Sequence, residues 1–199
     1  MLTWLLRGIA HLPLPVLHAL GSFLGRIYFG TGRMGRRTRN NLRASGIAPD
    51  ETSLRRLCRT TARESGKGAL ETIAIWYRPQ SVLLNWMRVC HGWEHVEQAW
   101  AAQKSIIFLT PHLGCFEITA QYYAAHRPIS VLFRPPRKTW MMPLIIGRAR
   151  DNLRLAPTTL KGVRELLKAL KQGEAIGILP DQTPGKNEGE WAEFFGRPA

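Results

Sequence analysis

The sequence contains few cysteines and lacks the spacings of several common functional sites. Its three cysteines include no CxxC pair, which argues against a disulfide framework or a cysteine-rich zinc site and favours a reducing compartment. The histidines form one helical i,i+4 pair, His91 and His95, without an obvious third ligand, so no metal site is predicted. Gly30-Thr-Gly32 has no GK[ST] ending, which argues against a nucleotide-binding loop. No cofactor is therefore expected.

Acidic residues are also scarce: 14 Asp and Glu stand against 28 Lys and Arg, giving a formal net charge of +14. This surplus indicates an anionic partner, which could be nucleic acid, anionic lipid, a phosphorylated substrate or an acidic carrier protein. No zinc-finger spacing, RNP-like aromatic motif or helix-turn-helix pattern is evident, so no nucleic-acid partner is predicted. With 199 residues, 45% of them apolar, the chain is long enough for one domain with a substantial core.

The N-terminus lacks an unbroken apolar run of clear membrane-spanning length. Eighteen uncharged residues lie between Arg7 and Arg26, whereas a spanning helix needs about 20 apolar residues. Pro13 and Pro15 predict a break between two short helices. We predict a helical membrane anchor over residues 1–30, lying in or partly crossing the bilayer; an ordinary core helix is the alternative. The arginines that follow suit anionic headgroups on the cytoplasmic side: Arg33, Arg36, Arg37, Arg39 and Arg43.

The remainder, residues 31–199, is predicted to form an α/β domain with a central mixed sheet flanked by helices. Short β-rich runs alternate there with amphipathic helical segments, as in sheets covered by helices. The predicted strands are 105–110, 129–133, 154–156 and 175–179. The predicted helices are 51–78, 93–102, 116–126, 141–152 and 160–171.

Polar, reactive side chains stand at the ends of three of these strands. His112 follows the first strand, Arg134 ends the second, and Asp181 follows the last. In open α/β sheets, ligands bind outside the carboxyl ends of the strands. We therefore expect these three residues to gather at one edge of one sheet.

The segment Thr110-Pro-His-Leu-Gly-Cys-Phe-Glu117 contains a His and a Glu five positions apart. On a regular helix they would diverge by roughly 140°, so the two side chains meet only if His112 lies on a loop before the helix. Such a His can take a proton from an alcohol while a carboxylate fixes its tautomer. The alternatives are a structural His112, or Cys115 acting as a nucleophile with His112 as its base, although a Cys is more commonly a small buried hydrophobe.

Several segments, in conserved order along the chain, resemble the late acyltransferases of lipid A biosynthesis, the lauroyl/myristoyl transferase family. This family shares its HxxxxD/E pair with lysophospholipid acyltransferases. The resembling segments are LTPHLGCFEITAQ (109–121), LFRPPRK (132–138), GRAR (147–150), GVRELLKALKQGEAIGILPDQTPG (162–185) and EFFGRPA (193–199).

This resemblance implies transfer of a fatty acyl chain from an acyl-carrier-protein thioester to a hydroxyl of a lipid A precursor, at the cytoplasmic face of the inner membrane. It also implies contact with membrane lipids. His112 would be the general base and Glu117 its partner. Arg134, Arg148 and Asp181 would bind substrate, with the arginines on anionic groups.

The sequence departs from the family pattern in three places. Cys115 and Phe116 stand where many relatives carry Asn and Trp, and Glu193 replaces a proline. The family also continues for roughly another hundred residues, so we expect a chain without its C-terminal third. The alternatives are a glycerolipid (lysophosphatidate-type) acyltransferase, against which the PDQ and GRAR segments speak, and an inactive membrane-binding fragment.

Overall fold

The computed structural model describes residues 2–136, 142–181, 191–194 and 196–198, which form two compact units. The first unit contains the residues up to His11 together with Thr72–Asp181, and the second contains Leu12–Glu71 and the described residues after 190. Parts of the predicted features lie outside the described residues. These parts are the first residue of the predicted helix 141–152, and positions 137–138, 182–185, 195 and 199 of the family-like segments.

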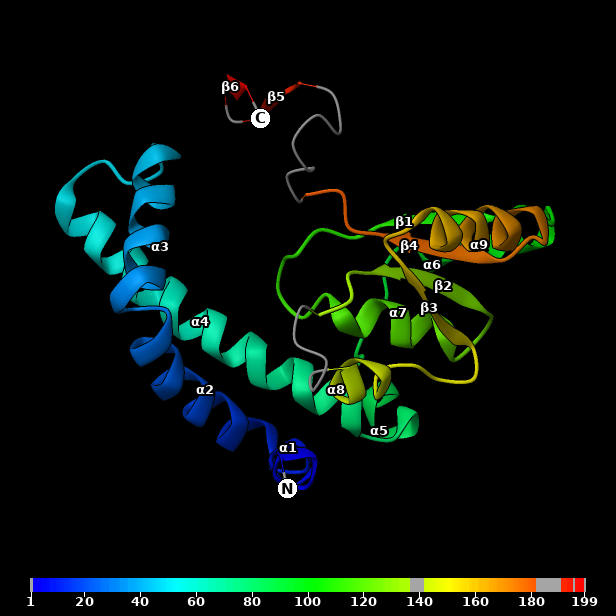
Figure 1. Cartoon of the computed structure of the whole chain (residues 1–199), viewed down its shortest axis with the longest axis horizontal. Coiled ribbons are helices and arrows are strands. Elements are labelled where there is room, and N and C mark those ends of the chain that lie inside the picture. Colours follow the sequence, from blue (N-terminus) through cyan, green and yellow to red (C-terminus); the bar gives the residue numbers. More distant parts are fainter. Residues whose placement is uncertain (1, 137–141, 182–190, 195, 199) are drawn as a thin grey trace. The chain divides into compact units, whose positions relative to one another are not determined.

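A four-stranded sheet forms the centre of the first unit (Figure 1). Its strands are β1 (Ile106–Leu109), β2 (Ile129–Phe133), β3 (Leu153–Pro157) and β4 (Ala175–Ile178), in the spatial order β1-β4-β2-β3. The α/β prediction is confirmed, whereas the prediction of a mixed central sheet is wrong, because every strand pairing described in this four-stranded sheet is parallel. Each connection between successive strands contains a helix, and such crossovers return the chain to the same end of the sheet.

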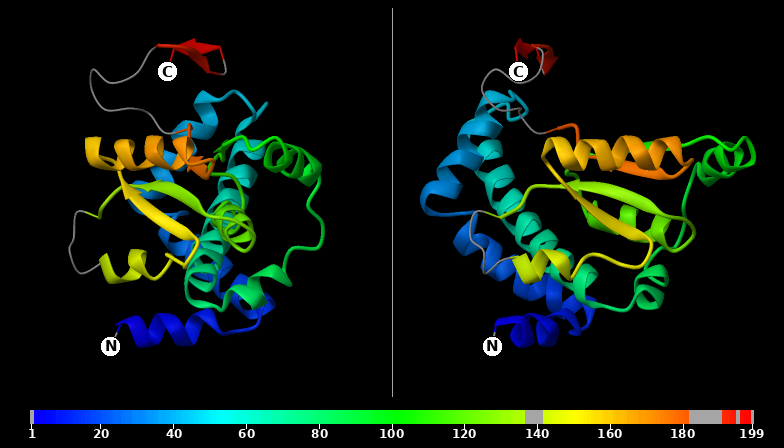
Figure 2. Two further views of the ribbon diagram at one scale, coloured as in Figure 1. Left: turned by 90° about the vertical axis from the view of Figure 1, so that its right-hand side faces the viewer. Right: turned by 45° about the vertical axis from the view of Figure 1, so that its right-hand side comes forward.

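Helices α7 (Glu117–Ala124) and α9 (Leu160–Lys171) cover opposite faces of this sheet (Figures 1 and 2). Neighbouring residues of one strand point to opposite faces, so Ala175 packs on the α7 side and Ile176 on the α9 side. Helix α6 (Trp93–Ala101) adds aromatic side chains to the α7 side. The α7-side core consists of Tyr123, Ala124, Ile129, Val131, Leu153 and Ala175. The α9-side core consists of Ala156, Leu166, Ala169 and Ile176.

The first unit also contains α1 (Leu2–Ala10), α5 (Gln80–Leu84), α8 (Met142–Ile146) and the end of α4 (Glu51–Tyr77). Two arginines connect the end of α4 to α1 and to the segment after α8. Arg78 donates from Nε to the carbonyl oxygen of Ala10 at 2.6 Å. Arg150 donates from Nη2 to the carbonyls of Ile75, Trp76 and Arg78 at 3.3, 3.1 and 2.8 Å. Burial lowers the pKa of both guanidinium groups. Arg150 therefore satisfies the carbonyl groups that the end of α4 leaves without helical partners.

The second unit is built on a close crossing of α2 (Leu14–Tyr28) and α4, with α3 (Gly32–Ala44) and the short strands β5 (Glu193–Phe194) and β6 (Arg197–Pro198). Glycines at the crossing let the two backbones touch. A Cβ atom on Gly66 would overlap the carbonyl oxygen of Gly21, and one on Gly25 would overlap that of Ala62. Each helix thus presents two small residues spaced four positions apart: Gly21 and Gly25 on α2, and Ala62 and Gly66 on α4.

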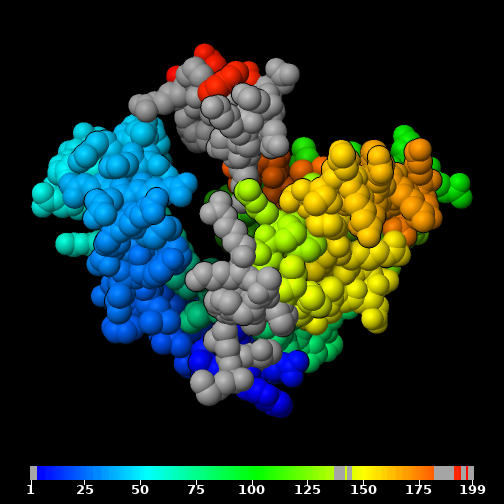
Figure 3. Space-filling model, viewed as in Figure 1, coloured from blue at the N-terminus to red at the C-terminus, as the bar shows by residue number. Residues whose placement is uncertain are grey.

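The break predicted at the N-terminal prolines is present, because α1 ends at Ala10 and α2 begins at Leu14. Among the described residues, no single helix combines the length and apolar composition of a membrane span; only the bent pair Trp4–Ala10 and Leu14–Tyr28 does so together. The surface of α2 and α3 faces the viewer in Figure 3, coloured blue. Large apolar side chains are exposed on α2: Val16, Phe23, Leu24, Ile27 and Tyr28.

Candidate functional site

The candidate site lies at the carboxyl edge of the sheet, where β1 and β4 run side by side. The Thr110 amide donates to the Ile178 carbonyl at 2.9 Å, which continues the ladder past β1. His112 and Asp181 follow directly, and their side chains meet: Nδ1 of His112 lies 2.8 Å from Oδ1 of Asp181. The His112 backbone amide donates to Oδ2 of the same carboxylate at 2.7 Å. One carboxylate thus holds this residue at two points.

A loop precedes α7, as the sequence predicts for His112. Gly114 has φ of +59°, in the left-handed region that favours glycine, and Glu117 is the first residue of α7. The His112 ring packs edge-on against Phe116, with 4.7 Å between ring centroids. Two hydrogen bonds from His112 lower the pKa of Asp181; the bond from the ring has the larger effect and the bond from the backbone amide the smaller. This carboxyl therefore stays ionised at neutral pH.

Glu117 takes part in a different pair. Its carboxylate, only 7% exposed, forms an ion pair with Arg148, whose Nη2 lies 3.1 Å away, and accepts a hydrogen bond from Nε1 of Trp76 at 3.2 Å. Arg148 is 9% exposed. Within the described part of the chain, Glu117 and His112 share no hydrogen bond, although the sequence places them as a contacting pair. The edge therefore holds two separate contacts, a hydrogen bond between His112 and Asp181 and an ion pair between Glu117 and Arg148.

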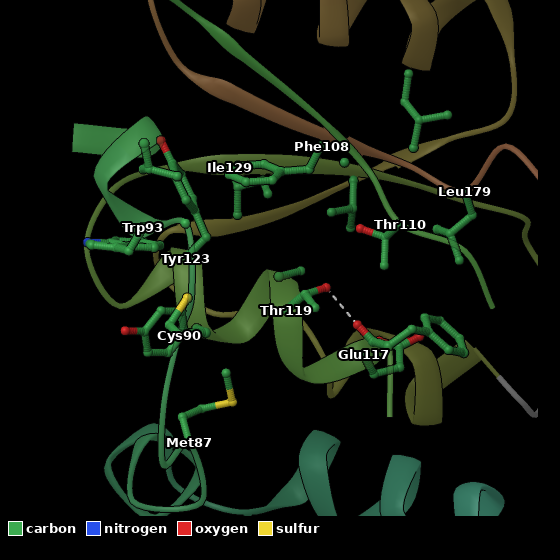
Figure 4. Close-up of a pocket in the computed structure, with 18 of the residues that line it drawn as sticks. Met87, Cys90, Trp93, Phe108, Thr110, Glu117, Thr119, Tyr123, Ile129 and Leu179 are labelled. Carbon is green, nitrogen blue, oxygen red and sulfur yellow. Dashed lines mark hydrogen bonds between the residues drawn. The ribbon is translucent and has the colours of Figure 1, made fainter. Parts of the chain in front are cut away.

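An apolar cavity of about 260 Å³ lies on the α7 side of the sheet. In Figure 4, Glu117, Thr110 and Leu179 stand at one end, and Trp93, Cys90 and Met87 at the other. A dashed line there marks the hydrogen bond that the Thr119 hydroxyl donates to the Phe116 carbonyl at 2.7 Å. Because Phe116 lines the cavity and also touches the His112 ring, the imidazole lies beside the Glu117 end.

Gly177 creates room for this cavity. Strand pairing places Gly177 of the central strand β4 between Phe108 of β1 and Val131 of β2, and all three residues line the cavity. A Cβ atom on Gly177 would come within 2.9 Å of Cγ1 of Val131. Any larger residue would crowd the middle of the cavity.

Four of the five predicted site residues thus form two contacts, while the fifth, Arg134, is exposed directly after β2. Trp76, which hydrogen-bonds to Glu117, was missed, and no local pattern in the sequence marks it. The aromatic end of the cavity was also missed, although Trp93, Tyr122 and Tyr123 lie in segments predicted to be helical. Among the described residues, no group of three or more His, Cys, Asp or Glu side chains could hold a metal ion.

The sequence is similar to known proteins along nearly its whole length. The family model described as bacterial lipid A biosynthesis acyltransferase matches residues 1–199. The lipid A biosynthesis lauroyltransferase of Escherichia coli K12 is 27% identical over 98% of this chain, and the palmitoleoyltransferase of the same organism is 25% identical over 98%. A lipid A biosynthesis acyltransferase of Haemophilus influenzae is 26% identical over 96%. The chain spans 64%, 64% and 61% of the lengths of these relatives. It belongs to the bacterial lipid A biosynthesis acyltransferase family.

Proposed function

We propose that this protein transfers a fatty acyl chain from an acyl-carrier-protein thioester to a hydroxyl of a lipid A precursor. The observation that carries the proposal is an apolar cavity that begins beside His112, an exposed histidine at the edge of the sheet, in a member of this family. Relatives that match nearly the whole chain are named for lauroyl and palmitoleoyl transfer. A long apolar pocket with a few polar groups at one end suits a hydrocarbon chain with a reactive head.

In this proposal His112 is the general base. Its Nε2 takes the proton of the acceptor hydroxyl as the oxygen attacks the thioester carbonyl, which is typically worth ~10²–10⁴-fold in rate. The carboxylate on the other ring nitrogen supports this role by fixing the tautomer. The acyl chain extends from this point toward Trp93 and Cys90.

The basic residues have two proposed roles. Arg148 is buried against Glu117 and lines the cavity, so its charge acts at the reacting end of the acyl chain. Arg134 is exposed at the sheet edge and suits an anionic group of the lipid or of the carrier's phosphopantetheine arm.

We also propose that residues 1–30 bind the cytoplasmic face of the inner membrane. The exposed apolar side chains of α2 and the arginines of α3 favour an interfacial position beside anionic headgroups. Burial of the α2 side chains in the bilayer and attraction of the α3 arginines to anionic headgroups would then hold the protein at the membrane that contains its lipid acceptor.

The test is a transfer assay with the purified 199-residue protein, an acyl-carrier-protein thioester, a lipid A precursor and lysophosphatidate as a competing acceptor. Mass spectrometry should show the lipid A precursor gaining one acyl chain. This product should vanish in His112→Ala and persist in the control His95→Ala, which alters an exposed histidine outside the site. Transfer that survives His112→Ala, a preference for lysophosphatidate, or no transfer at all would each contradict the proposal.

A further inference from the structure

A second pocket, of about 340 Å³, lies in the second unit between the start of α3 and the first turns of α4. The two helices lie side by side there (Figure 1), and ion pairs of Glu51 with Arg39 and Arg43 join them. The described residues of the lining include no Asp or Glu. They are three glycines, a threonine, a cysteine and four arginines: Gly30, Thr31, Gly32, Gly35, Arg36, Arg39, Arg55, Cys58 and Arg59. The pocket is therefore strongly basic.

Helical spacing brings the four arginines of this pocket together. Arg36 and Arg39 are three positions apart on α3, so both lie on one face of that helix. Arg55 and Arg59 are four positions apart on α4, with the same result. Arg39 and Arg55 contact Glu51, whereas no ion pair involves Arg36 or Arg59 in the part of the chain that the structure describes. Because one carboxylate stands against four guanidinium groups, a bound anion would relieve their mutual repulsion.

A glycine-rich turn adds backbone donors to the pocket. Thr31 precedes α3, and the first amide groups of any α-helix have no acceptor within the helix. Gly32 has φ of +57°, and a Cβ atom on Gly35 would come within 2.6 Å of the Gly30 carbonyl oxygen, so the turn before the helix is tight. Phosphate groups bind where helix-start amides and arginines occur together. The turn has no nucleotide-binding sequence, so its chemistry suits a phosphate group without a nucleoside.

The apolar surface that leads to the pocket indicates where this phosphate comes from. Helix α2 ends at Tyr28, and the pocket begins at Gly30. The last two turns of α2 expose large apolar side chains: Phe23, Leu24, Ile27 and Tyr28. A lipid bilayer presents phosphate at the headgroup level and hydrocarbon directly below it, so one surface of this kind can contact both.

We propose that this pocket binds one phosphate group of an anionic lipid headgroup. The inference rests on the membrane binding proposed above, and it adds a discrete site to the general attraction between arginines and headgroups. Arg55 and Arg59 of α4 join the contact, and Arg36 is separated in function from Arg33 and Arg37, which lie on α3 outside the lining. The second unit would then hold a single lipid molecule as well as lie against the bilayer.

The first test uses the thiol of Cys58, which lines the pocket, in the full 199-residue protein. Labelling by N-ethylmaleimide is followed by mass spectrometry, with the exposed Cys90 as internal reference. Inorganic phosphate, compared with chloride at equal ionic strength, should slow the labelling of Cys58 and leave Cys90 unchanged. Vesicles of phosphatidylcholine that contain phosphatidylglycerol should also protect Cys58, whereas vesicles of phosphatidylcholine alone should not.

The second test compares two double variants that lose the same charge. Arg36→Gln/Arg59→Gln removes two arginines of the lining. The control Arg33→Gln/Arg56→Gln removes two exposed arginines of the same helices outside the lining. The pocket variant should bind inorganic phosphate roughly tenfold more weakly or worse, because it loses charged hydrogen-bond donors, while the control should bind like the wild type. At saturating lipid, protection of Cys58 should persist in the control and be lost in the pocket variant.

The outcomes separate the pocket from the proposed membrane position. Equal losses in the two double variants would overturn the pocket and leave only general attraction to the membrane. Protection of Cys58 by inorganic phosphate but not by vesicles would overturn the lipid source and assign the pocket to a soluble phosphate compound. If neither protects Cys58 while the wild type still binds the vesicles, the inference fails and the proposed membrane position stands.

Discussion

The pair between Glu117 and Arg148 offers a quantitative test of the site's architecture. We predict that Glu117→Leu strongly destabilises the protein, because it leaves a guanidinium that is only 9% exposed without its anionic partner. Among the described residues, Nε of Arg148 already has no hydrogen-bond partner, so the ion pair with Glu117 is what balances the charge of this group.

Removing one member of a buried ion pair typically costs about 3–5 kcal/mol, since the remaining charge is desolvated and unpaired. At about 1.4 kcal/mol per factor of ten, the unfolding equilibrium constant should rise ~10²–10⁴-fold. With a urea dependence of about 2 kcal/mol per molar, the unfolding midpoint should fall by roughly 2 M. The double variant Glu117→Leu/Arg148→Met replaces both charges by apolar groups and should recover most of this loss.

Urea denaturation of the four proteins in the cycle, followed by circular dichroism, measures the coupling between the two residues. The wild type and the Arg148→Met single variant complete the set. A loss below about 1 kcal/mol in Glu117→Leu, or simple additivity in the double variant, would refute the reasoning that this pair is an internal, mutually dependent unit.

Three further predictions follow from other contacts. Gly177→Val should narrow the cavity, so the protein should prefer acyl donors with shorter chains. The relative transfer rate should fall by about fourfold for each methylene that no longer fits. An unchanged preference in a competition assay with donors of graded length would contradict the cavity assignment. Gly66→Ala should lower the free energy of unfolding by about 1–3 kcal/mol, because the added methyl group would meet the α2 backbone. The control Gly68→Ala, on the same helix, adds a methyl group that meets nothing within 4 Å, so it should be neutral or stabilising. Equal effects of the two substitutions in thermal melts would refute the close crossing. Asp50, directly before α4, accepts a hydrogen bond from the Ser53 amide at 2.7 Å, and this bond lowers the pKa of the Asp50 carboxyl. The wild type should therefore be more stable than Asp50→Ala at neutral pH, and this difference in stability should vanish as the pH falls through the lowered pKa. A stability difference that persists in strong acid would contradict the prediction.

Much of the fold could be predicted from the pattern of apolar residues. The strand 129–133 and the helix 160–171 have the predicted bounds, because a short β-branched run and a well-marked amphipathic repeat each give a strong local signal. The break at the N-terminal prolines followed from the chemistry of Pro13. The mixed sheet was the error, since local pattern does not report strand direction.

The site was only partly predictable, for a topological reason. The sequence places His112, Arg134 and Asp181 at strand ends, but the insertion of β4 between β1 and β2 decides which two of them touch. Glu117 lies five positions from His112, and this proximity suggested a contact that the geometry of the Gly114 loop does not make. The contact between Glu117 and Arg148 spans 31 positions and depends on tertiary packing, which periodicity does not encode.

The central claim, that His112 and the adjoining cavity transfer an acyl chain to lipid A, is tested most directly in cells. A Gram-negative host that lacks one late acyl transfer makes underacylated lipid A, and this chain can be expressed there with or without His112→Ala. Mass spectrometry of the extracted lipid A should show one added acyl chain with the wild-type chain and none with the variant. An unchanged lipid A mass with the folded wild-type chain, or an equal gain with His112→Ala, would contradict the account.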